Sequence, residues 1–530
     1  MRPPRFAPSA ALATVLAVAA CGPASGPRVP DDDSLVVALE SAPIHFDPRL
    51  ATDQASARVF ELAMNGLVTQ DEDGRYRPDL AESWEVLDEG RRWRFRLRPG
   101  VRFHDGSELD AADVAWTYGS LLDGSVVSAK RGAFAKVESV VAVDAATVDF
   151  VTREPFAALL GNLNSYVAVV PAGRTPEQQN REPVGTGPFR VAGRTPDTVE
   201  LAAFDGHWAG RPRLDRIVLR EVPDSTVRAL ELRKGSVQLV VNGLPPDVVP
   251  LFEHDARFRV ARKPGSNYVY LGLNLEDPLL ANARVRRALA LSLDRPRLVA
   301  TLWRGLGTVT ETMLPPGHWA RDEELPLSPH DPASARRLLD EAGFPDPDGA
   351  DGPRPRLTLT YKTSTDETAV LQAQILQAMA AEAGIALEIR SHEFATFFQD
   401  VQRGAFQVFS LTRTGIDDPD LYALLFHSAN VPPAGANRGR YRNPELDRLL
   451  DLGARQVEPA RRREVYLEVQ RILARDLPYV SLFSRTNVAV MPAALDGYRH
   501  YPSGELLSLA RVAWRRPGEV SARLGSTTTR

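Results

Sequence analysis

The spacing of apolar and polar residues predicts alternating strands and helices along most of the chain. Between Arg92 and Leu97, large apolar residues alternate with arginines, which is typical of a half-buried strand. The same two-residue period recurs at 357–361 and 385–389, on either side of a predicted helix at 368–383. Further strands are predicted at 36–39, 406–409 and 486–490, and a further helix at 53–68.

Capping residues mark the helices of the second half. Asp294, Asp331 and Asn443 each precede an apolar helical pattern with a proline in its first turn. Gly305 and Gly343 follow the ends of the first two patterns. Because strands alternate with helices at this spacing, the sequence favours a mainly parallel sheet covered by helices. We therefore expect two α/β lobes with crossing connections, and an inserted subdomain in the first half.

Length and charge narrow the class of protein. A chain of 530 residues exceeds what one hydrophobic core usually serves, so two or three lobes are expected. The 64 basic and 68 acidic residues nearly balance, which argues against nucleic acid or an anionic membrane surface as a partner. After the N-terminal segment, no apolar run approaches the roughly 18 residues that a membrane-spanning helix needs.

The N-terminal segment predicts export. Arg2 and Arg5 precede a short run of small apolar residues at 8–20, and Cys21, the only cysteine, follows that run. A run this short is typical of a secretory signal peptide rather than of a membrane span. The residues before Cys21 are similar to a bacterial lipobox, which implies that residues 1–20 are removed and that Cys21 is lipidated. The alternative is an ordinary signal peptide with an incidental cysteine.

Three further segments together resemble the signature block of one protein family. They are residues 80–84 (LAESW), 93–106 (WRFRLRPGVRFHDG) and 112–114 (ADV). The family is the bacterial extracellular solute-binding proteins of family 5, the peptide/nickel type that serves ABC importers. Other segments similar to its motifs are 183–189 (PVGTGPF), 285–289 (VRRAL), 335–343 (ARRLLDEAG), 418–420 (DPD) and 443–447 (NPELD). The similarity covers essentially all of residues 35–510.

The resemblance implies an α/β fold. It is a two-lobed clamshell of the periplasmic-binding-protein type (class II, the large peptide-binding form) with an extra inserted subdomain. The family layout assigns residues 1–20 to a lipoprotein signal peptide, 21–34 to a flexible linker, 35–50, 170–270 and 485–525 to the first lobe, 51–169 to the inserted subdomain, and 271–484 to the second lobe. Closure of the lobes would present one shape to a membrane permease.

The implied function is that of a receptor held by its lipid at a membrane surface, in the periplasm or outside the cell. It captures a short peptide or peptide-like solute between the lobes and delivers it to an ABC permease. The resemblance implies a monomer with no cofactor, no metal and no nucleic-acid partner. An enzyme is disfavoured, because the sequence has no GxSxG elbow, no HExxH helix and no thiol nucleophile beyond Cys21. Alternatives are a non-peptide ligand (an opine, an oligosaccharide or a metal chelate) and a sensor or chaperone role without transport.

The segment 411–422 (LTRTGIDDPDLY) carries the first candidate ligand residues. In peptide-binding members of the family, the matching stretch lines the cleft, and an aspartate before the Asp-Pro-Asp motif takes the α-ammonium of the peptide. Gly415 stands at that position here, and Asp417 is near enough to replace the aspartate. Arg413 offers a fork for a carboxylate or phosphate. The candidates are Arg413, Thr414, Gly415, Asp417 and Asp418; the alternative is that the acids are solvated and that Arg413 forms a salt bridge.

The segment from Ser41 to Phe46 carries the second set. In the family, an extended ligand pairs its backbone with such a segment, as a strand adds to a sheet edge. Pro43 lacks an amide hydrogen, so this pairing would be interrupted. The candidates are Ser41, Ala42, His45 and Phe46, and His45 could also meet a metal-linked ligand.

Several other conspicuous residues favour structural roles. His104-Asp105-Gly106 and the Gly185–Gly187 segment are expected to be turns rather than a catalytic pair and a phosphate cradle. The phenylalanines of 394–398 are expected in the core. The arginines of 438–442 are expected to be solvated loop charges, and those of 461–463 to lie on a helix exterior.

Overall fold

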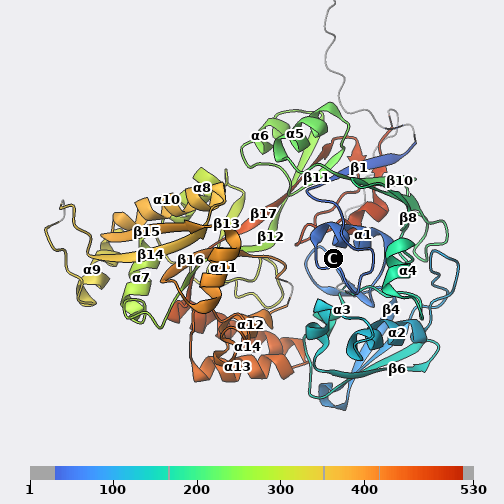
Figure 1. Cartoon of the computed structure of the whole chain (residues 1–530), viewed down its shortest axis with the longest axis horizontal. Helices are drawn as coiled ribbons and strands as arrows, with labels where there is room; N and C mark the ends of the chain where they lie inside the picture. The colour runs from blue at the N-terminus through green and yellow to red at the C-terminus, as the bar shows by residue number, and fades with distance from the viewer. Residues whose placement is uncertain (1–29, 31, 165–166, 350–351, 417, 517–530) are drawn as a thin grey trace, which may run out of the picture.

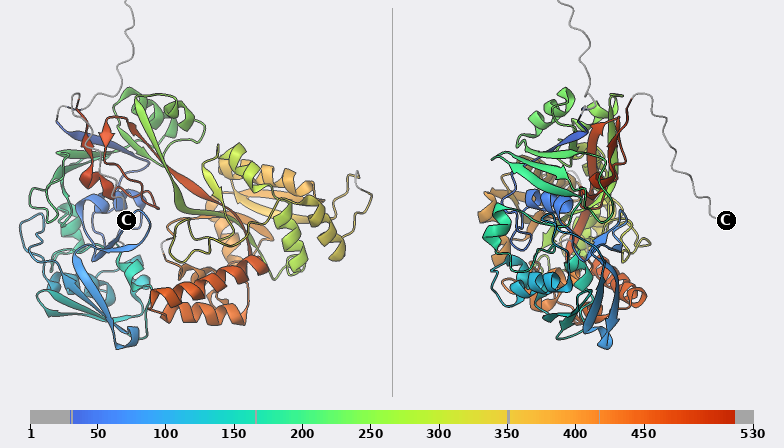
Figure 2. Two further views of the ribbon diagram at one scale, coloured as in Figure 1. Left: turned by 180° about the vertical axis from the view of Figure 1, so that it is seen from behind. Right: turned by 90° about the vertical axis from the view of Figure 1, so that its right-hand side faces the viewer.

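The computed structural model describes residue 30 and residues 32–164, 167–349, 352–416 and 418–516. The predicted signal peptide, Cys21 and Asp417 therefore lie outside the described residues. Among the described residues, no helix is long and apolar enough to cross a membrane. Figures 1 and 2 show two bodies of mixed helix and strand that are joined by a pair of long strands.

The largest element is one eleven-stranded sheet that runs through both bodies. Its strands follow the order β15-β14-β16-β12-β17-β11-β1-β10-β9-β8, and β13 pairs with β17 beside this path. The second body contributes β13 (Gly307–Val309), β14 (Leu357–Ser364), β15 (Ile385–His392) and β16 (Val408–Arg413). The first body contributes β1 (Ser34–Leu39), β8 (Phe189–Arg194), β9 (Thr198–Ala203), β10 (Arg216–Glu221) and β11 (Leu239–Val241).

Two long antiparallel strands connect the bodies. Strand β12 (Phe258–Leu273) pairs with β17 (Tyr479–Pro492) over most of its length. At one end β17 also pairs with β11 of the first body, and at the other β12 pairs with β16 of the second. The register shifts at two places, and the larger shift lies between Pro264 and Tyr268, where three residues of β12 oppose one residue of β17. The crossing connections are thus hydrogen-bonded strands, drawn in green and red in Figure 2.

Helices cover both faces of the sheet in the second body. One face packs against α7 (Ala283–Ser292), α8 (Arg295–Leu302), α9 (Pro332–Glu341) and α10 (Glu367–Ala381). The other packs against α11 (Phe394–Arg403), α12 (Leu421–Phe426), α13 (Pro444–Arg455) and α14 (Pro459–Asp476).

The prediction of a mainly parallel sheet was wrong. Strand β14 is parallel to β15 and β16, but β12 is antiparallel to both β16 and β17. A helix joins β14 to β15 and another joins β15 to β16, and such crossovers keep strands parallel. Strand β12 instead runs from the first body into the second, and β17 runs back from the second to the first, so these two strands are antiparallel and the sheet is mixed.

The first body packs its core around β1 and the first helix. Helix α1 (Gln54–Ala63) contributes Val59 and Leu62 to a core that it shares with Val37 of β1 and Ile217 of β10. Its remaining helices and short strands are α4 (Pro176–Arg181), α5 (Ser225–Lys234), α6 (Val249–Glu253), β18 (Leu495–Asp496) and β19 (Ala513–Trp514).

A separate core lies beside it, in a smaller antiparallel sheet of order β4-β5-β7-β6. Trp93 and Phe95 of β5 are buried there, as their alternation with arginines predicts. The elements of this part are β4 (Ala81–Leu87), β5 (Arg92–Leu97), α2 (Ala111–Leu122), β6 (Val137–Asp144), β7 (Thr147–Thr152) and α3 (Leu159–Leu163), with the hairpin β2 (Val68–Gln70) and β3 (Tyr76–Pro78).

The predicted caps are confirmed. The side chains of Asp294, Asp331 and Asn443 each accept hydrogen bonds from backbone amides in the first turn of α8, α9 and α13. Several element bounds were wrong. The helix predicted at 53–68 ends at Ala63, because the backbone becomes extended at Met64 and then enters β2. Strand β16 begins two residues later than predicted and continues to Arg413, and β17 extends well beyond 486–490 on both sides.

The Gly185–Gly187 turn lies against the end of α1, and this close approach explains its glycines. A Cβ on Gly185 would stand 2.2 Å from the Ala63 carbonyl oxygen, and one on Gly187 would stand 2.4 Å from the Ala63 carbonyl carbon. His104 holds the turn from another side: its Nδ1 accepts the Gly185 amide at 3.3 Å, and its Nε2 donates to the Gly187 carbonyl at 3.0 Å. The expected structural roles of both motifs are confirmed.

Candidate functional site

Strand β16 leads directly into the first candidate segment. Arg413 is its last residue and pairs with Tyr268 of β12. Thr414 and Gly415 follow and are exposed. The φ of Gly415 is +64°, in the left-handed region that favours glycine, and no atom would lie within 4 Å of a Cβ there. The positive φ of the backbone explains a glycine at this position, because a larger side chain would have room there.

The next residue, Ile416, lines a pocket between the two bodies. Other walls are the tip of the β2–β3 hairpin (70–74), Lys263 and Pro264 of β12, and the loop 315–318. The pocket holds about 40 Å³, whereas ligand sites commonly measure about 300–1,000 Å³. This pocket as it stands is therefore too small for a ligand of peptide size.

Arg413 lies among stacked tyrosines. The ring of Tyr270 stacks on Tyr268 with centroids 5.3 Å apart and on Tyr479 with centroids 4.4 Å apart. Burial lowers the pKa of Arg413, and the positive charge of Arg438 lowers it further. The Nε of Arg413 is buried without a hydrogen-bond partner. No acid of the described residues lies close enough to stabilise its charge.

Arg438 is buried, so the expectation that it is a solvated loop charge was wrong. Only 9% of the residue is exposed, and its Nε also lacks a hydrogen-bond partner. Its guanidinium lies 5.0 Å from the ring centroid of Phe398 on α11. The other arginines of the loop differ: Arg440 pairs with Glu276 at 3.2 Å, and Arg442 is exposed.

Asp418 belongs to a buried ion network at the start of α14. Arg462 donates to its carboxylate at 2.6 Å and to Asp420 at 3.0 Å. Burial opposes the charge of Arg462, but the two carboxylates outweigh it and raise the pKa of Arg462. The Tyr76 hydroxyl of β3 donates to Asp418 at 3.4 Å. The expectation that 461–463 lie on a helix exterior was therefore wrong for Arg462, which is 5% exposed.

The second candidate segment, from Ser41 to Phe46, is irregular rather than a strand. Ser41 is exposed, and Ala42 and His45 are half-buried. The amides of Ile44 and His45 both donate to the Ser56 hydroxyl, at 3.1 and 3.0 Å. These two donors already have partners within the protein, which limits the backbone pairing that this segment can offer.

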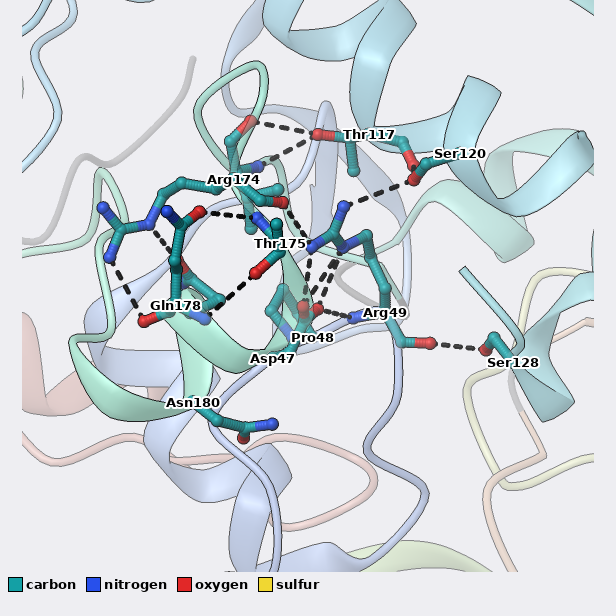
Figure 3. A network of polar contacts seen from close by, with 12 residues as sticks. Asp47, Pro48, Arg49, Thr117, Ser120, Ser128, Arg174, Thr175, Gln178 and Asn180 are labelled. Carbon is teal, nitrogen blue, oxygen red and sulfur yellow. Dashed lines mark hydrogen bonds and ion pairs between the residues drawn. The ribbon is translucent and has the colours of Figure 1, made fainter. Parts of the chain in front are cut away.

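At Phe46 the segment becomes fixed to the first body. Its ring is buried in the core of the first body, and its amide donates to the Asn180 side chain at 2.6 Å. Beyond it, Asp47 and Arg49 form a fully buried ion pair at 2.7 Å. Figure 3 shows Arg49 bonded in addition to Ser120 of α2 and to the backbone carbonyl of Arg174. This network fixes where the segment leaves the core.

The structure brings Arg413, Thr414, Gly415 and Asp418 onto one loop beside the first body. No hydrogen bond or ion pair between described residues joins this loop to Ser41–Phe46. Sequence reasoning missed Tyr270, Tyr479 and Tyr76 as neighbours of the loop. For Tyr270, the alternation with Tyr268 in a strand was the available signal. Among the residues that the structure describes, no group of three or more histidine, cysteine or acidic side chains could hold a metal ion.

A protein-family model matches most of the part of the chain that the structure describes. Residues 75–432 match the model of the bacterial extracellular solute-binding proteins, family 5 (middle region). This match spans more than half of the chain and includes the candidate loop 411–416.

Individual proteins resemble the chain over nearly its whole length. A probable di/tripeptide-binding protein 5 from Pseudomonas aeruginosa is 30% identical, over 91% of this chain and 96% of its own. A heme-binding protein A from Haemophilus influenzae is 26% identical, over 89% and 91%. The solved structure of the oligopeptide-binding protein AppA from Bacillus subtilis, in complex with a nonapeptide, is 26% identical and covers 91% of this chain and 99% of its own, with a TM-score of 0.72.

Proposed function

Because this chain belongs to family 5 of the bacterial extracellular solute-binding proteins, which bind solutes and are not enzymes, we propose that it captures a short peptide or peptide-like solute and delivers it to an ABC importer. The observation that carries the proposal is the paired-strand connection β12–β17 beside a pocket with walls from both bodies. Two bodies joined in this way can close around a ligand, and binding then selects the closed form. Peptide-binding relatives support the ligand class.

The proposed ligand contacts are the nine candidate residues. On the second body they are Arg413, Thr414, Gly415, Asp417 and Asp418, and on the first body Ser41, Ala42, His45 and Phe46. Their surroundings suggest different roles. Arg413 lacks a partner for its Nε and is suited to bind a ligand group. The Asp418 carboxylate is bound by Arg462, so its role would be to hold the loop in place.

We retain the three-part division of the chain as a proposal, with one boundary moved. Helix α1 packs into the core of the first body, whereas Leu67 and Val68 belong to the core of the smaller sheet. The inserted subdomain is therefore better begun near residue 67 than at residue 51. The first lobe then carries α1, and with it the Gly185–Gly187 turn.

The proposed lipid anchor rests on the sequence before the described residues. If Cys21 is lipidated, the Cys21→Ser variant should appear in the soluble extracytoplasmic fraction, whereas the unaltered protein stays with membranes. Fractionation followed by mass measurement of the N-terminal peptide checks this result. A Cys21→Ser protein that still sediments with membranes would contradict the anchor.

A non-peptide ligand is the second candidate. Gly415 stands where peptide-binding members of the family carry the aspartate for the α-ammonium, and one relative is a heme-binding protein. Native mass spectrometry of freshly purified protein, followed by identification of what denaturation releases, separates the two candidates. A mixture of short peptides supports the peptide proposal. A single non-peptide species would contradict it.

A further inference from the structure

The guanidinium groups of Arg413, which is half-buried, and of Arg438, which is buried, lie near the same tyrosine of the second body. The Nε atoms of Arg413 and Arg438 are both buried and unbonded. The charges of Arg413 and Arg438 both act on the Tyr270 hydroxyl, which also accepts a hydrogen bond from Arg438, so both guanidinium groups lie near it. Two other buried arginines each have a carboxylate partner: Arg49 pairs with Asp47 at 2.7 Å, and Arg295 with Glu311 at 2.6 Å. Among the described residues, no ion pair involves Arg413 or Arg438.

This arrangement is costly for the empty protein. Each guanidinium loses hydration on burial, and the two like charges repel each other in surroundings of low polarity. A buried arginine without an acid can have a structural role when backbone carbonyls accept its hydrogen bonds. The carbonyls of Leu280 and Asp476 do this for Arg286. A bound anion would meet both unbonded Nε donors and both charges at once, and the planar fork of arginine suits carboxylate and phosphate oxygens.

An aromatic surface continues from the pair toward solvent. Arg438 covers the ring of Phe398, and Phe394 stacks on Phe398 with centroids 5.8 Å apart and planes 15° apart. Phe394 is 55% exposed, although the sequence predicts a core position; of the three phenylalanines, only Phe397 is fully buried. A flat apolar group beside the anion would therefore find a ring to contact.

We propose that Arg413 and Arg438 form an anion-binding subsite that takes a carboxylate or phosphate of the transported ligand, with Phe394 and Phe398 contacting an adjacent apolar group. The inference rests on the proposed function and deepens it. The second lobe would recognise the negative end of its ligand, which agrees with the glycine at position 415, where an ammonium-binding acid is absent.

The test compares ligands that differ only in charge. A tripeptide library with free carboxylates and the same library as C-terminal amides are titrated against the purified protein, by calorimetry. We expect the acids to bind at least tenfold more tightly than the amides. Arg413→Gln and Arg438→Gln should each remove that preference, and Arg442→Gln, an exposed arginine of the same loop, should keep it. Equal affinity for acids and amides, or an unchanged preference in both Gln variants, would overturn the subsite.

A second panel separates this inference from the peptide proposal. If no tripeptide binds in either form, the peptide proposal fails, and phenylacetate and phenyl phosphate decide the subsite. If phenylacetate or phenyl phosphate binds and Arg413→Gln abolishes that binding, the anion subsite is supported, and the compound that binds more tightly identifies the anion. If neither compound binds, the subsite is overturned. Arg413→Gln should also raise the melting temperature of the empty protein by removing a half-buried charge that makes no ion pair with the described residues. A higher melting temperature would show that lost binding is not lost folding. A lower melting temperature would assign Arg413 a structural role instead.

Discussion

Single ionisable residues in this protein are held in the charge state that their neighbours require. His104 shows this most clearly. Its Nδ1 accepts the Gly185 amide while its Nε2 donates to the Gly187 carbonyl, so the ring is neutral with its hydrogen on Nε2. Burial lowers the pKa of His104 to about 4. A proton on Nδ1 would remove the acceptor for Gly185 and weaken the turn.

The His104→Gln substitution should change the pH dependence of stability. The folded protein binds fewer protons at this site than the unfolded chain between the folded pKa of about 4 and the unfolded value of about 6.5. The stabilisation by His104 is therefore complete above that window and is lost as the pH falls through it. We expect the variant to be less stable by about 1–2 kcal/mol at pH 7.5. The wild type loses about 1.4 kcal/mol of stability per pH unit below 6.5, so this deficit should vanish or reverse at pH 4.5. Urea unfolding at both pH values measures this, and an equal deficit at both would contradict a neutral histidine.

The turn at 104–106 could be predicted from sequence, whereas the contacts of His104 and the burial of Arg438 could not. A turn has a local explanation, and the positive φ of Gly106 confirms it. The bonds of His104 to Gly185 and Gly187 join segments more than 80 residues apart. The burial of Arg438 depends on how its loop folds over β12 and α11, and these elements lie far from it in sequence. Such long-range packing leaves no mark in the spacing of neighbouring residues.

Two backbone segments approach each other closely where the Gly185–Gly187 turn meets the end of α1. The backbones are so near that a single methyl group at either glycine would overlap Ala63. This contact holds α1 against the first core and directs the chain toward the β2–β3 hairpin. The glycines of this turn thus allow two backbone segments to pack in contact.

The Gly187→Ala substitution should destabilise the protein severely. Its Cβ would lie 2.4 to 2.7 Å from three backbone atoms of the α1 end, and a backbone cannot yield as a flexible side chain can. We expect a loss of about 3 kcal/mol or more, in the range of overpacked core positions. Thermal unfolding measures it. Gly193→Ala on β8 is the matched control, because no atom lies within 4 Å of that Cβ. Similar melting temperatures for the two variants would show that the turn can relax.

Helix starts were predictable and strand lengths were not, for a physical reason. A helix cap is a contact between residues two or three apart in sequence, so Asp294 and Asn443 could be recognised as caps from their immediate neighbours. The full length of β17 depends on β12, β11 and β13 pairing alongside it. For the same reason, the strand that carries Arg413 extends farther than its own apolar residues indicate.

The whole molecule is held together at a second place besides the paired strands. The subdomain touches α13 and α14 of the second body, as Figures 1 and 2 both show. Ala157 donates its amide to the Ala454 carbonyl at 3.1 Å, and Tyr76 donates to Asp418 at 3.4 Å. These contacts exist only while the bodies are near each other, so they favour the closed form.

The Tyr76→Phe substitution should weaken ligand binding without weakening either body. Loss of the bond to Asp418 removes about 1 kcal/mol from the closed form, which corresponds to roughly fivefold weaker affinity. Titration with the ligand recovered from the purified protein measures the affinity, and small-angle scattering measures how compact the liganded protein is. Arg455→Gln is the control, because its exposed pair with Glu154 at 3.6 Å contributes little. Unchanged affinity in Tyr76→Phe would show that this contact is not made in the liganded state.

The ladder of hydrogen bonds between β12 and β17 also determines what kind of mechanical element connects the bodies. Two bonded strands resist sliding past each other, but together they bend and twist as one elastic ribbon, most easily at the irregular step between Pro264 and Tyr268. Such a ribbon leaves the bodies little more than a single angle to vary. Ligands of different size would then change only the angle between the two bodies at which closure ends. A membrane partner could distinguish the occupied from the empty protein by that angle. Distances from several pairs of fluorescent labels should accordingly change in proportion to one another.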